Sequence, residues 1–247
     1  MTFLRSLLFF LWFGLVSATL AILCVPLLAG PRSGAAWLGR NWSKAVFWGL
    51  RVFAGTGFEV RGHRPDGVAL YAIKHMSMWD TCAVYMLLDD PAIVLKRGLQ
   101  MIPFYGWYLW KARMIPIDRD GGASTLRRMS VAAKAELARG RSIAIFPEGT
   151  RKKPGAAPDY KPGVAGLYGQ LGVACVPVAL NSGVFWTAFI KNPGTIVLEF
   201  LEPIPPGVPR REFMPQLELA IEGATARLVA EGQAALTADG LVPAQNS

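Results

Sequence analysis

Histidine and cysteine are scarce in this chain of 247 residues, which contains two histidines and three cysteines. The cysteines, Cys24, Cys82 and Cys175, lie far apart and form no C-x-x-C pair. This spacing argues against a disulfide framework and against a zinc site. We therefore expect buried thiols in a reducing compartment.

Acidic side chains are also few: 17 against 26 lysines and arginines, which gives a formal net charge of +9 and a sequence pI of about 9.7. This balance favours an anionic partner, that is, a nucleic acid, a phospholipid surface or a phosphorylated substrate. The longest run of cations is Arg151-Lys152-Lys153, and no nucleic-acid-binding module is recognisable. We therefore expect no nucleic-acid partner. The length suits one domain with appendages.

The N-terminal segment has no charged residue from Ser6 to Pro31, and no acidic residue precedes Glu59. About 20 apolar residues suffice to cross a bilayer, so Leu7 to Leu28 can span the membrane or lodge deeply in it. A cleaved signal peptide is the competing interpretation, although the apolar run is longer than a usual signal core. Because cations follow the run, the positive-inside tendency places the rest of the chain on the cytoplasmic face of the inner membrane.

A second N-terminal helix is expected next, because three cations, Arg40, Lys44 and Arg51, fall on one face at about 100° per residue. Apolar positions occupy the opposite face: Leu38, Trp42, Val46, Gly49 and Phe53. Such a helix could lie in the membrane interface with its cations toward the headgroups. The alternative is an ordinary surface helix packed on its own domain.

Short apolar runs alternate with longer amphipathic segments from Glu59 onward. The predicted strands are Val68–Ile73, Ala92–Leu95, Met114–Ile117, Ser142–Phe146, Ala174–Leu180 and Thr195–Leu201. The predicted helices are Asp80–Leu88, Ser124–Arg139, Gly163–Leu171 and Glu212–Leu236. This alternation predicts an α/β fold with a mostly parallel or mixed sheet flanked by helices. We therefore divide the chain into a membrane-anchoring helix pair (1–57), an α/β domain (58–238) and a flexible tail (239–247).

One histidine, His75, follows a predicted strand and precedes Asp80 by five residues. On one continuous helix these side chains would point about 140° apart, so they can meet only across a strand-to-helix turn. There the aspartate could hold one imidazole nitrogen and favour the imidazolium, which prepares a general base. The competing interpretation is structural, because Ser77-Met78-Trp79-Asp80 fits the S-x-x-D capping box. The other histidine, His63, is expected on the surface.

Charged residues follow three other predicted strands. In Phe146-Pro147-Glu148-Gly149-Thr150-Arg151 the glycine permits a tight turn beside a guanidinium that can grip phosphate oxygens. A salt-bridged turn is the alternative there. Lys96 and Arg97 follow a second strand, and Arg119 follows a third. Three basic strand ends in one sheet concentrate positive potential on one edge, unless they are merely solvated.

The order and spacing of these segments resemble those of the glycerolipid acyltransferases, most closely the bacterial 1-acyl-sn-glycerol-3-phosphate acyltransferases. The segments are the HxxxxD pair, KR-x-L followed by IPFYGW, IDR, FPEGTR and VPVALNSG. The HxxxxD pair alone would be weak, but the ordered set is specific and covers Gly62 to Pro205. Lys74 departs from the family, which usually has asparagine before the histidine, and Met76 and Met78 also replace commoner residues. These departures bear on substrate detail more than on chemistry.

The resemblance implies a membrane-associated enzyme of phospholipid biosynthesis that acylates the sn-2 hydroxyl of lysophosphatidic acid and gives phosphatidic acid. It implies that His75 removes the hydroxyl proton as the oxygen attacks an acyl thioester, with Asp80 as its orienter. Glu148 would bond the glycerol or steady Arg151. The implied phosphate-binding residues are Lys96, Arg97, Arg119, Glu148, Gly149, Thr150 and Arg151.

The resemblance implies no metal ion and no tightly bound cofactor. The acyl donor would be acyl-coenzyme A or acyl-acyl carrier protein, and the acceptor could also be lyso-ornithine lipid, glycerol-3-phosphate or another lysophospholipid. A hydrolase is a rival, but the chain has no G-x-S-x-G elbow. A non-catalytic membrane-binding module would suit the basic N-terminus and would leave the set of motifs unexplained.

Overall fold

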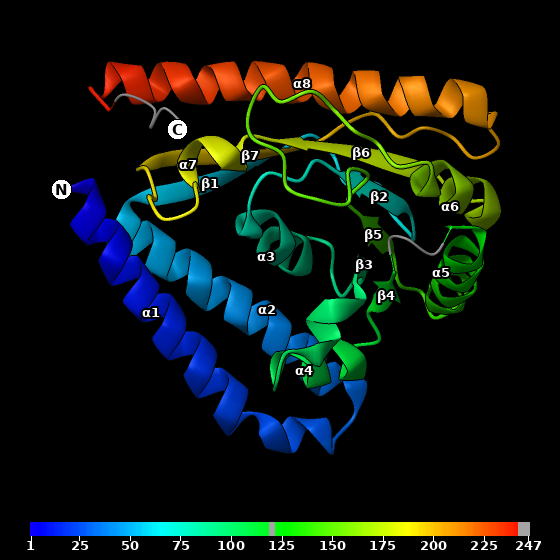
Figure 1. Ribbon diagram of the computed structural model, residues 1–247, viewed down its shortest axis with the longest axis horizontal. Coiled ribbons are helices and arrows are strands. Elements are labelled where there is room, and N and C mark those ends of the chain that lie inside the picture. The colour runs from blue at the N-terminus through cyan, green and yellow to red at the C-terminus, as the bar shows by residue number, and fades with distance from the viewer. Residues whose placement is uncertain (119–121, 242–247) are drawn as a thin grey trace.

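The computed structural model describes residues 1–118 and 122–241 and contains a seven-stranded sheet in the order β1-β7-β6-β2-β5-β3-β4 (Figure 1). Neighbouring strands are parallel except β6 and β7, which are antiparallel. The strands are β1 (Thr56–Arg61), β2 (Leu70–Ile73), β3 (Ala92–Lys96), β4 (Ile115–Ile117), β5 (Ile143–Ile145), β6 (Cys175–Leu180) and β7 (Gly194–Phe200). The predicted α/β fold with a mixed sheet is confirmed.

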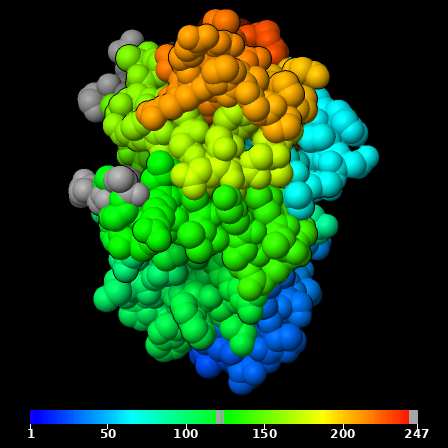
Figure 2. Space-filling view, turned by 90° about the vertical axis from the view of Figure 1, so that its right-hand side faces the viewer, coloured from blue at the N-terminus to red at the C-terminus, as the bar shows by residue number. Residues whose placement is uncertain are grey.

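Helices cover both faces of the sheet: α8 lies along one face, and α2 and α3 lie on the other (Figure 1). Seen from the side of α5 and α6, α8 (orange) occupies one end of the molecule and the N-terminal helices (blue) the other (Figure 2). The helices are α1 (Thr2–Leu23), α2 (Arg32–Gly49), α3 (Met78–Leu87), α4 (Tyr105–Lys111), α5 (Gly122–Leu137), α6 (Gly163–Leu171), α7 (Ser182–Phe185) and α8 (Arg210–Ala238). Shorter helical turns are η1 (Val25–Leu28), η2 (Leu50–Ala54) and η3 (Arg97–Met101).

Side chains along β2 alternate between two apolar cores, because successive residues of a strand point to opposite faces. Tyr71 and Ile73 pack into the core that includes α2 and α3. Leu70 and Ala72 pack into the core that includes α5, α6 and α8. We therefore expect the residues directly after β2 to continue this alternation, so that one side chain points toward α3 and the next toward α8.

The six predicted strands overlap β2 to β7, and the four predicted helices overlap α3, α5, α6 and α8. The sequence does not predict β1, α4 or α7. β1 is an edge strand whose middle residues are exposed, so it shows no clear alternation of apolar and polar positions. The division of the chain at residues 57 and 58 falls within β1 and stays a prediction.

α1 is, within the described ranges, the one helix long and apolar enough to cross a membrane. It lies antiparallel to α2, as two indole contacts show. The Nε1 of Trp12 donates to the carbonyl of Ala45 at 2.9 Å, and the Nε1 of Trp42 donates to the hydroxyl of Ser17 at 2.9 Å. The two N-terminal helices therefore form the expected pair.

The apolar face of α2 packs on the α/β domain. Val46 is buried, and the ring of Phe47 stacks on that of Trp79 in α3 with the centroids 5.2 Å apart. On the polar face, Arg40 forms a salt bridge with Asp89 at 2.5 Å. The helix thus packs on its own domain, and its place in the membrane interface stays a prediction.

Candidate active site

Four parallel strands, β2, β3, β5 and β6, end at one edge of the sheet and bring the predicted site segments there. His75 follows β2, Glu148 follows β5, and Ser182 follows β6. In open α/β sheets, ligands bind at the carboxyl ends of the strands. This edge is therefore the candidate active site.

His75 and Asp80 meet across the turn between β2 and α3. The Nδ1 of His75 lies 2.9 Å from the Oδ2 of Asp80. The capping box is also present: Ser77 is the N-cap of α3, and Asp80 Oδ2 accepts the N–H groups of Ser77 and Met76 at 2.8 and 2.7 Å. Asp80 therefore caps the helix and holds the imidazole with the same carboxylate, so the two interpretations of its position do not exclude each other.

The second oxygen of Asp80 binds two hydroxyls. The hydroxyl of Ser182 donates to Oδ1 at 2.5 Å, and that of Ser77 lies 3.2 Å from the same oxygen. Asp80 is fully buried, so these donors replace the water that a carboxylate would otherwise bind. A carboxylate held in this way accepts the Nδ1 proton of His75 and leaves the lone pair on Nε2.

The imidazole is held on its other sides as well. Its ring stacks on Phe146 with the centroids 4.1 Å apart, and the backbone carbonyl of His75 accepts the N–H of Lys152 at 2.8 Å. The side chain is 13% exposed, and Nε2 has no hydrogen-bond partner among the residues that the structure describes. Nε2 is therefore the nitrogen that a substrate hydroxyl could reach.

The FPEGTR segment forms the tight turn that its glycine predicts, with Gly149 at a φ of 64°. Glu148 is buried in this turn, and its Oε1 accepts a hydrogen bond from the Nζ of Lys74 at 2.8 Å. Glu148 thus contacts Lys74 and not Arg151. Thr150 and Arg151 are exposed at the edge, so the guanidinium is available to an anion.

The basic strand ends are exposed but not all unpaired. Lys96 closes β3, and Arg97 directly after it forms a salt bridge with Asp118 at 2.8 Å. Both partners of that bridge are about half exposed, and such a pair contributes about 0–1 kcal/mol to stability. An incoming phosphate could therefore take the place of Asp118 beside Arg97. Arg119, the third predicted cation, lies outside the described residues.

Several polar residues beside the site are not predicted from the sequence. Ser182 lies 102 positions from Asp80, and its one sequence signal is its place at the end of the VPVALNSG segment. Lys74 is visible in the sequence only as a departure from the family. Its partner Glu222 lies 148 positions away on α8, in a helix without any motif, so no sequence signal could have paired the two.

The buried thiols take no part in the site. Cys82 and Cys175 are buried as expected, whereas Cys24 is only half-buried. Burial raises the pKa of the Cys82 thiol to about 12, which keeps it protonated and unreactive near neutral pH. Within residues 1–118 and 122–241, no cluster of three or more His, Cys, Asp or Glu side chains could hold a metal ion. His63 is exposed, as predicted.

Known proteins share this sequence pattern. Residues 57–181 match the family model described as Acyltransferase. The 1-acyl-sn-glycerol-3-phosphate acyltransferase of Pseudomonas aeruginosa is 32% identical over 200 residues, which cover 78% of this chain and 77% of that protein. The lyso-ornithine lipid O-acyltransferase of the same organism is 30% identical over 213 residues, which cover 77% of this chain and 80% of that protein.

The fold is shared with a solved structure. The crystal structure of the 1-acyl-sn-glycerophosphate (LPA) acyltransferase PlsC from Thermotoga maritima superposes with a TM-score of 0.73 at 21% identity, over 95% of this chain and 98% of that one. The α/β fold is thus common to both. The chain belongs to the acyltransferase family, and the resemblance inferred from its motifs is confirmed.

Proposed function

We propose that this acyltransferase transfers a fatty acyl group from an acyl thioester to the sn-2 hydroxyl of 1-acyl-glycerol-3-phosphate and so makes phosphatidic acid. The observation that carries the proposal is the contact of 2.9 Å between His75 Nδ1 and Asp80 Oδ2, which leaves Nε2 as an accessible base. The name and the 32% identity of the Pseudomonas aeruginosa relative support the choice of acceptor.

In this reaction, Nε2 of His75 takes the proton of the acceptor hydroxyl as the oxygen attacks the thioester carbonyl. The imidazolium formed is stabilised by the carboxylate of Asp80. When the carbon–sulfur bond breaks, the departing thiolate takes the proton from Nε2. The ester and the free thiol leave, and the base is restored without a covalent acyl-enzyme.

The substrate phosphate binds at the same edge. Arg151 offers a planar guanidinium that can hold two phosphate oxygens at once. Lys96 and Arg97 add positive charge from β3, and the turn at Gly149 and Thr150 places backbone and hydroxyl groups nearby. Arg119 keeps its proposed role in binding the phosphate. Glu148 supports the turn through its buried contact with Lys74. No tightly bound cofactor is needed, and the donor is acyl-coenzyme A or acyl-acyl carrier protein.

Lyso-ornithine lipid is the second candidate acceptor, because a relative named for it is 30% identical over 77% of this chain. An amino-acid headgroup offers a carboxylate and an ammonium where lysophosphatidic acid offers a phosphate. The exposed Arg151 could bind either anion, but a dianionic phosphate gains more from several cations. We therefore rank lysophosphatidic acid first.

The membrane is the proposed site of action. Both ends of α1 contact the α/β domain: Ser6 Oγ accepts the N–H of Lys191 at 2.9 Å, and the carbonyl of Ala21 accepts the hydroxyl of Tyr108 at 3.1 Å. A helix crossing the hydrocarbon core, about 30 Å thick, would carry one end away from the domain. We place α1 within the cytoplasmic leaflet of the inner membrane, where the enzyme meets its lipid substrate.

The deciding experiment incubates the purified enzyme with one labelled acyl thioester and a panel of acceptors: lysophosphatidic acid, lyso-ornithine lipid, glycerol-3-phosphate and lysophosphatidylethanolamine. We expect the fastest labelling with lysophosphatidic acid. Release of labelled free fatty acid without ester formation would identify a hydrolase. Binding to vesicles without either product would identify a membrane-binding module, and a preference for lyso-ornithine lipid would establish the second candidate.

A further inference from the structure

Beside the catalytic pair lies a buried ion cluster centred on Lys74. Its Nζ donates to Oε1 of Glu148 at 2.8 Å and to both carboxylate oxygens of Glu222 at 2.8 and 3.0 Å. The hydroxyl of Tyr160 donates to Oε1 of Glu222 at 2.8 Å. The side chains of Lys74 and Glu148 are only 2% and 1% exposed. All three donors of the ammonium are thus directed at carboxylates.

The alternation of β2 explains why Lys74 can reach α8. Leu70 and Ala72 face the core under α8, so Lys74, two residues further, continues on that face. His75 follows Tyr71 and Ile73 on the opposite face, toward α3. Lys74 and His75 therefore point to opposite faces of the sheet. Because the two residues are consecutive, a shift of the Lys74 backbone also moves the backbone of His75.

The cluster joins three parts of the chain that the sequence keeps apart. Lys74 belongs to the end of β2, Glu148 to the FPEGTR turn, and Glu222 to α8. Tyr160 adds the segment that leaves this turn. Both ends of this segment, residues 152–161, are hydrogen-bonded to the site. The N–H of Lys152 donates to the carbonyl of His75 at 2.8 Å, and the N–H of Lys161 donates to the carbonyl of Pro147 at 2.9 Å.

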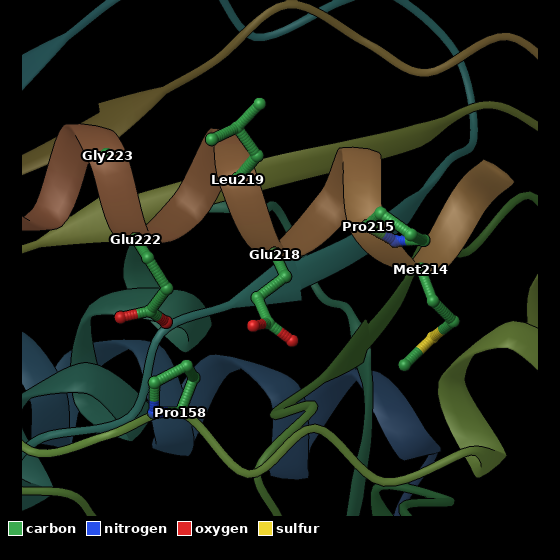
Figure 3. Close-up of a pocket in the computed structure, with 7 residues that line it drawn as sticks. All are labelled: Pro158, Met214, Pro215, Glu218, Leu219, Glu222 and Gly223. Atoms are coloured by element: carbon green, nitrogen blue, oxygen red, sulfur yellow. The ribbon is translucent and has the colours of Figure 1, made fainter.

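Figure 3 shows the outer side of this arrangement. Glu218 and Glu222 point from α8 toward Pro158 in the segment that follows the turn. They line a groove of about 590 Å³ between the helix and that segment. The groove leaves Glu222 25% exposed, whereas Lys74 and Glu148 are closed off behind it.

Lys74 supplies the positive charge in this cluster. One ammonium faces two carboxylates, and a buried carboxylate without a partner is driven toward protonation or toward water. Burial raises the pKa of Glu148, and the hydrogen bond and charge of Lys74 oppose that rise. The Oε2 of Glu148 is buried and has no hydrogen-bond partner among the described residues. Lys74 is thus the main reason for Glu148 to remain in place as a carboxylate.

We infer that Lys74 is a positioning residue for acyl transfer, which sets Glu148 and the turn carrying Arg151 at a fixed place relative to His75. The inference rests on the proposed function and adds to it a residue that touches neither substrate. Without the ammonium, Glu148 turns toward water and the backbone at Gly149 moves with it. The acceptor phosphate is then bound at a shifted position, so that the acceptor hydroxyl no longer lies within reach of Nε2 of His75.

The test compares the wild type with Lys74→Met, Glu222→Met and the double variant, all purified in detergent micelles. For each protein, the melting temperature, kcat, and KM for lysophosphatidic acid and for the acyl donor are measured. We expect Lys74→Met to melt at a lower temperature and to lose about 100-fold in kcat/KM for the acceptor, since misplacements of about 1 Å have effects of this size. KM for the donor should change less.

The double variant separates positioning from stability. It lacks the repulsion between Glu148 and Glu222 that Lys74→Met leaves unopposed, so its melting temperature should recover part of the loss. Its kcat/KM should stay low, because Glu148 still lacks the ammonium. If Lys74→Met proves too unstable to purify, the double variant is compared with Glu222→Met, which keeps the pair of Lys74 and Glu148 and should keep the higher kcat/KM. Recovery of both quantities together would overturn the inference and leave Lys74 as a charge compensator.

Lys191→Met is the matched control, because Lys191 is also fully buried and its Nζ is bound by backbone carbonyls beside α1, with none of the contacts of Lys74. Whatever its melting temperature, it should keep the kcat and KM of the wild type. An equal loss in this control, or wild-type kinetics in Lys74→Met, would also overturn the inference. A wild type that acylates no acceptor would overturn the proposed function as well.

Discussion

A single carboxylate holds the catalytic turn together. Asp80 accepts hydrogen bonds from two backbone amides, two hydroxyls and one imidazole. The sequence offers capping and catalysis as competing interpretations of this residue, and the turn between β2 and α3 lets one side chain make both sets of contacts. The carboxylate that caps the start of α3 therefore also fixes the orientation of the His75 imidazole.

His75 itself is the sharpest test of the mechanism. Replacing it with alanine removes the base that takes the hydroxyl proton, and such a loss typically costs about 10²- to 10⁴-fold in rate. We expect His75→Ala to show this loss in acyl transfer while its circular dichroism and its binding to vesicles match the wild type. Residual activity above about a tenth of the wild-type rate would remove His75 from the mechanism.

Ser182 provides a residue-scale test with a different readout. In Ser182→Ala the carboxylate of Asp80 loses one donor, so its charge is less satisfied and it attracts the imidazolium of His75 more strongly. A larger fraction of His75 is then protonated, and the acid limb of the pH–rate profile should move to higher pH. A hydrogen bond to a charged group is worth about 1.5–3 kcal/mol, and one pKa unit corresponds to about 1.4 kcal/mol, so the shift should be at most about two pH units.

Ser130→Ala is the control for that measurement, because Ser130 is equally buried but lies on α5, away from the edge. Its pH–rate profile should coincide with that of the wild type. An unmoved acid limb in Ser182→Ala would show that the hydroxyl only fills space beside Asp80.

The sequence predicts some of these residues and not others for a physical reason. His75 and Asp80 are five positions apart, so the geometry of one turn relates them. Ser182 and Glu222 reach the site only because parallel strands and a helix over the opposite face bring distant segments together. A pairing of that kind depends on the register and order of the sheet, which local patterns do not contain.

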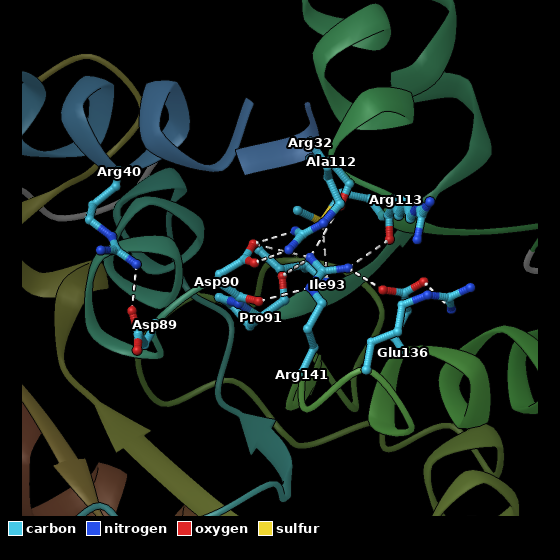
Figure 4. Close-up of polar contacts among 12 residues, drawn as sticks. Arg32, Arg40, Asp89, Asp90, Pro91, Ile93, Ala112, Arg113, Glu136 and Arg141 are labelled. Atoms are coloured by element: carbon cyan, nitrogen blue, oxygen red, sulfur yellow. Dashed lines mark hydrogen bonds and ion pairs between the residues drawn. The ribbon is translucent and has the colours of Figure 1, made fainter. Parts of the chain in front are cut away.

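At the scale of elements, a second ion network holds α2 against the amino ends of β3 and β5 (Figure 4). Arg141, before β5, is buried and donates to carboxylate oxygens of Glu136 at 2.5 Å and Asp90 at 3.3 Å. It also donates to the backbone carbonyls of Asp90, Pro91, Ala112 and Arg113. Asp90 in turn binds Arg32 at the start of α2 at 2.6 Å. One guanidinium thus ties α5, α4 and the segment between α3 and β3 together.

Arg141→Met should strongly destabilise the fold. Breaking a buried ion pair by removing one partner typically costs about 3–5 kcal/mol, because the remaining charge is left uncompensated in the interior. We expect the free energy of unfolding, measured with denaturant in micelles, to fall by this amount.

Arg139→Met is the matched control for Arg141→Met, because Arg139 pairs with the same Glu136 at 3.0 Å but is about half exposed. Its loss should cost less than about 1 kcal/mol. Similar losses for the two variants would show that burial of Arg141 adds nothing to the fold.

The elements that the sequence fails to predict are those whose signals are not local. β1 pairs with β7, and its middle residues are exposed, so neither a period of two nor a continuous apolar run marks it. α4 begins after Phe104 at a φ of 62°, a backbone conformation that phenylalanine rarely adopts and that no propensity would suggest. The core strands β2, β5 and β6, by contrast, are short, buried and apolar, and the sequence marks all three.

For the whole molecule, hydropathy identifies α1 but does not decide how it meets the membrane. Its outward face carries leucines at helical spacing, Leu4, Leu8, Leu11 and Leu15, each more than two-fifths exposed. The aromatic side chains of Trp107 and Trp110 on α4 are also exposed. An apolar surface of this kind suits the acyl-chain region of one leaflet, where the lysolipid acceptor lies.

The position of α1 leads to a prediction about sidedness. Because Ser6 and Ala21 both bind the α/β domain, the two ends of α1 should lie on the same side of the membrane. In a Cys24→Ser background, one protein carries a short cysteine-bearing tag before Met1 and another carries Ser33→Cys at the start of α2. A membrane-impermeant maleimide should label both in inside-out vesicles and neither in intact spheroplasts. The same pattern is expected of His63→Cys, an exposed position on the α/β domain. Labelling of the tag alone in spheroplasts would show that α1 crosses the bilayer, and its contacts with Lys191 and Tyr108 could then not form in the membrane.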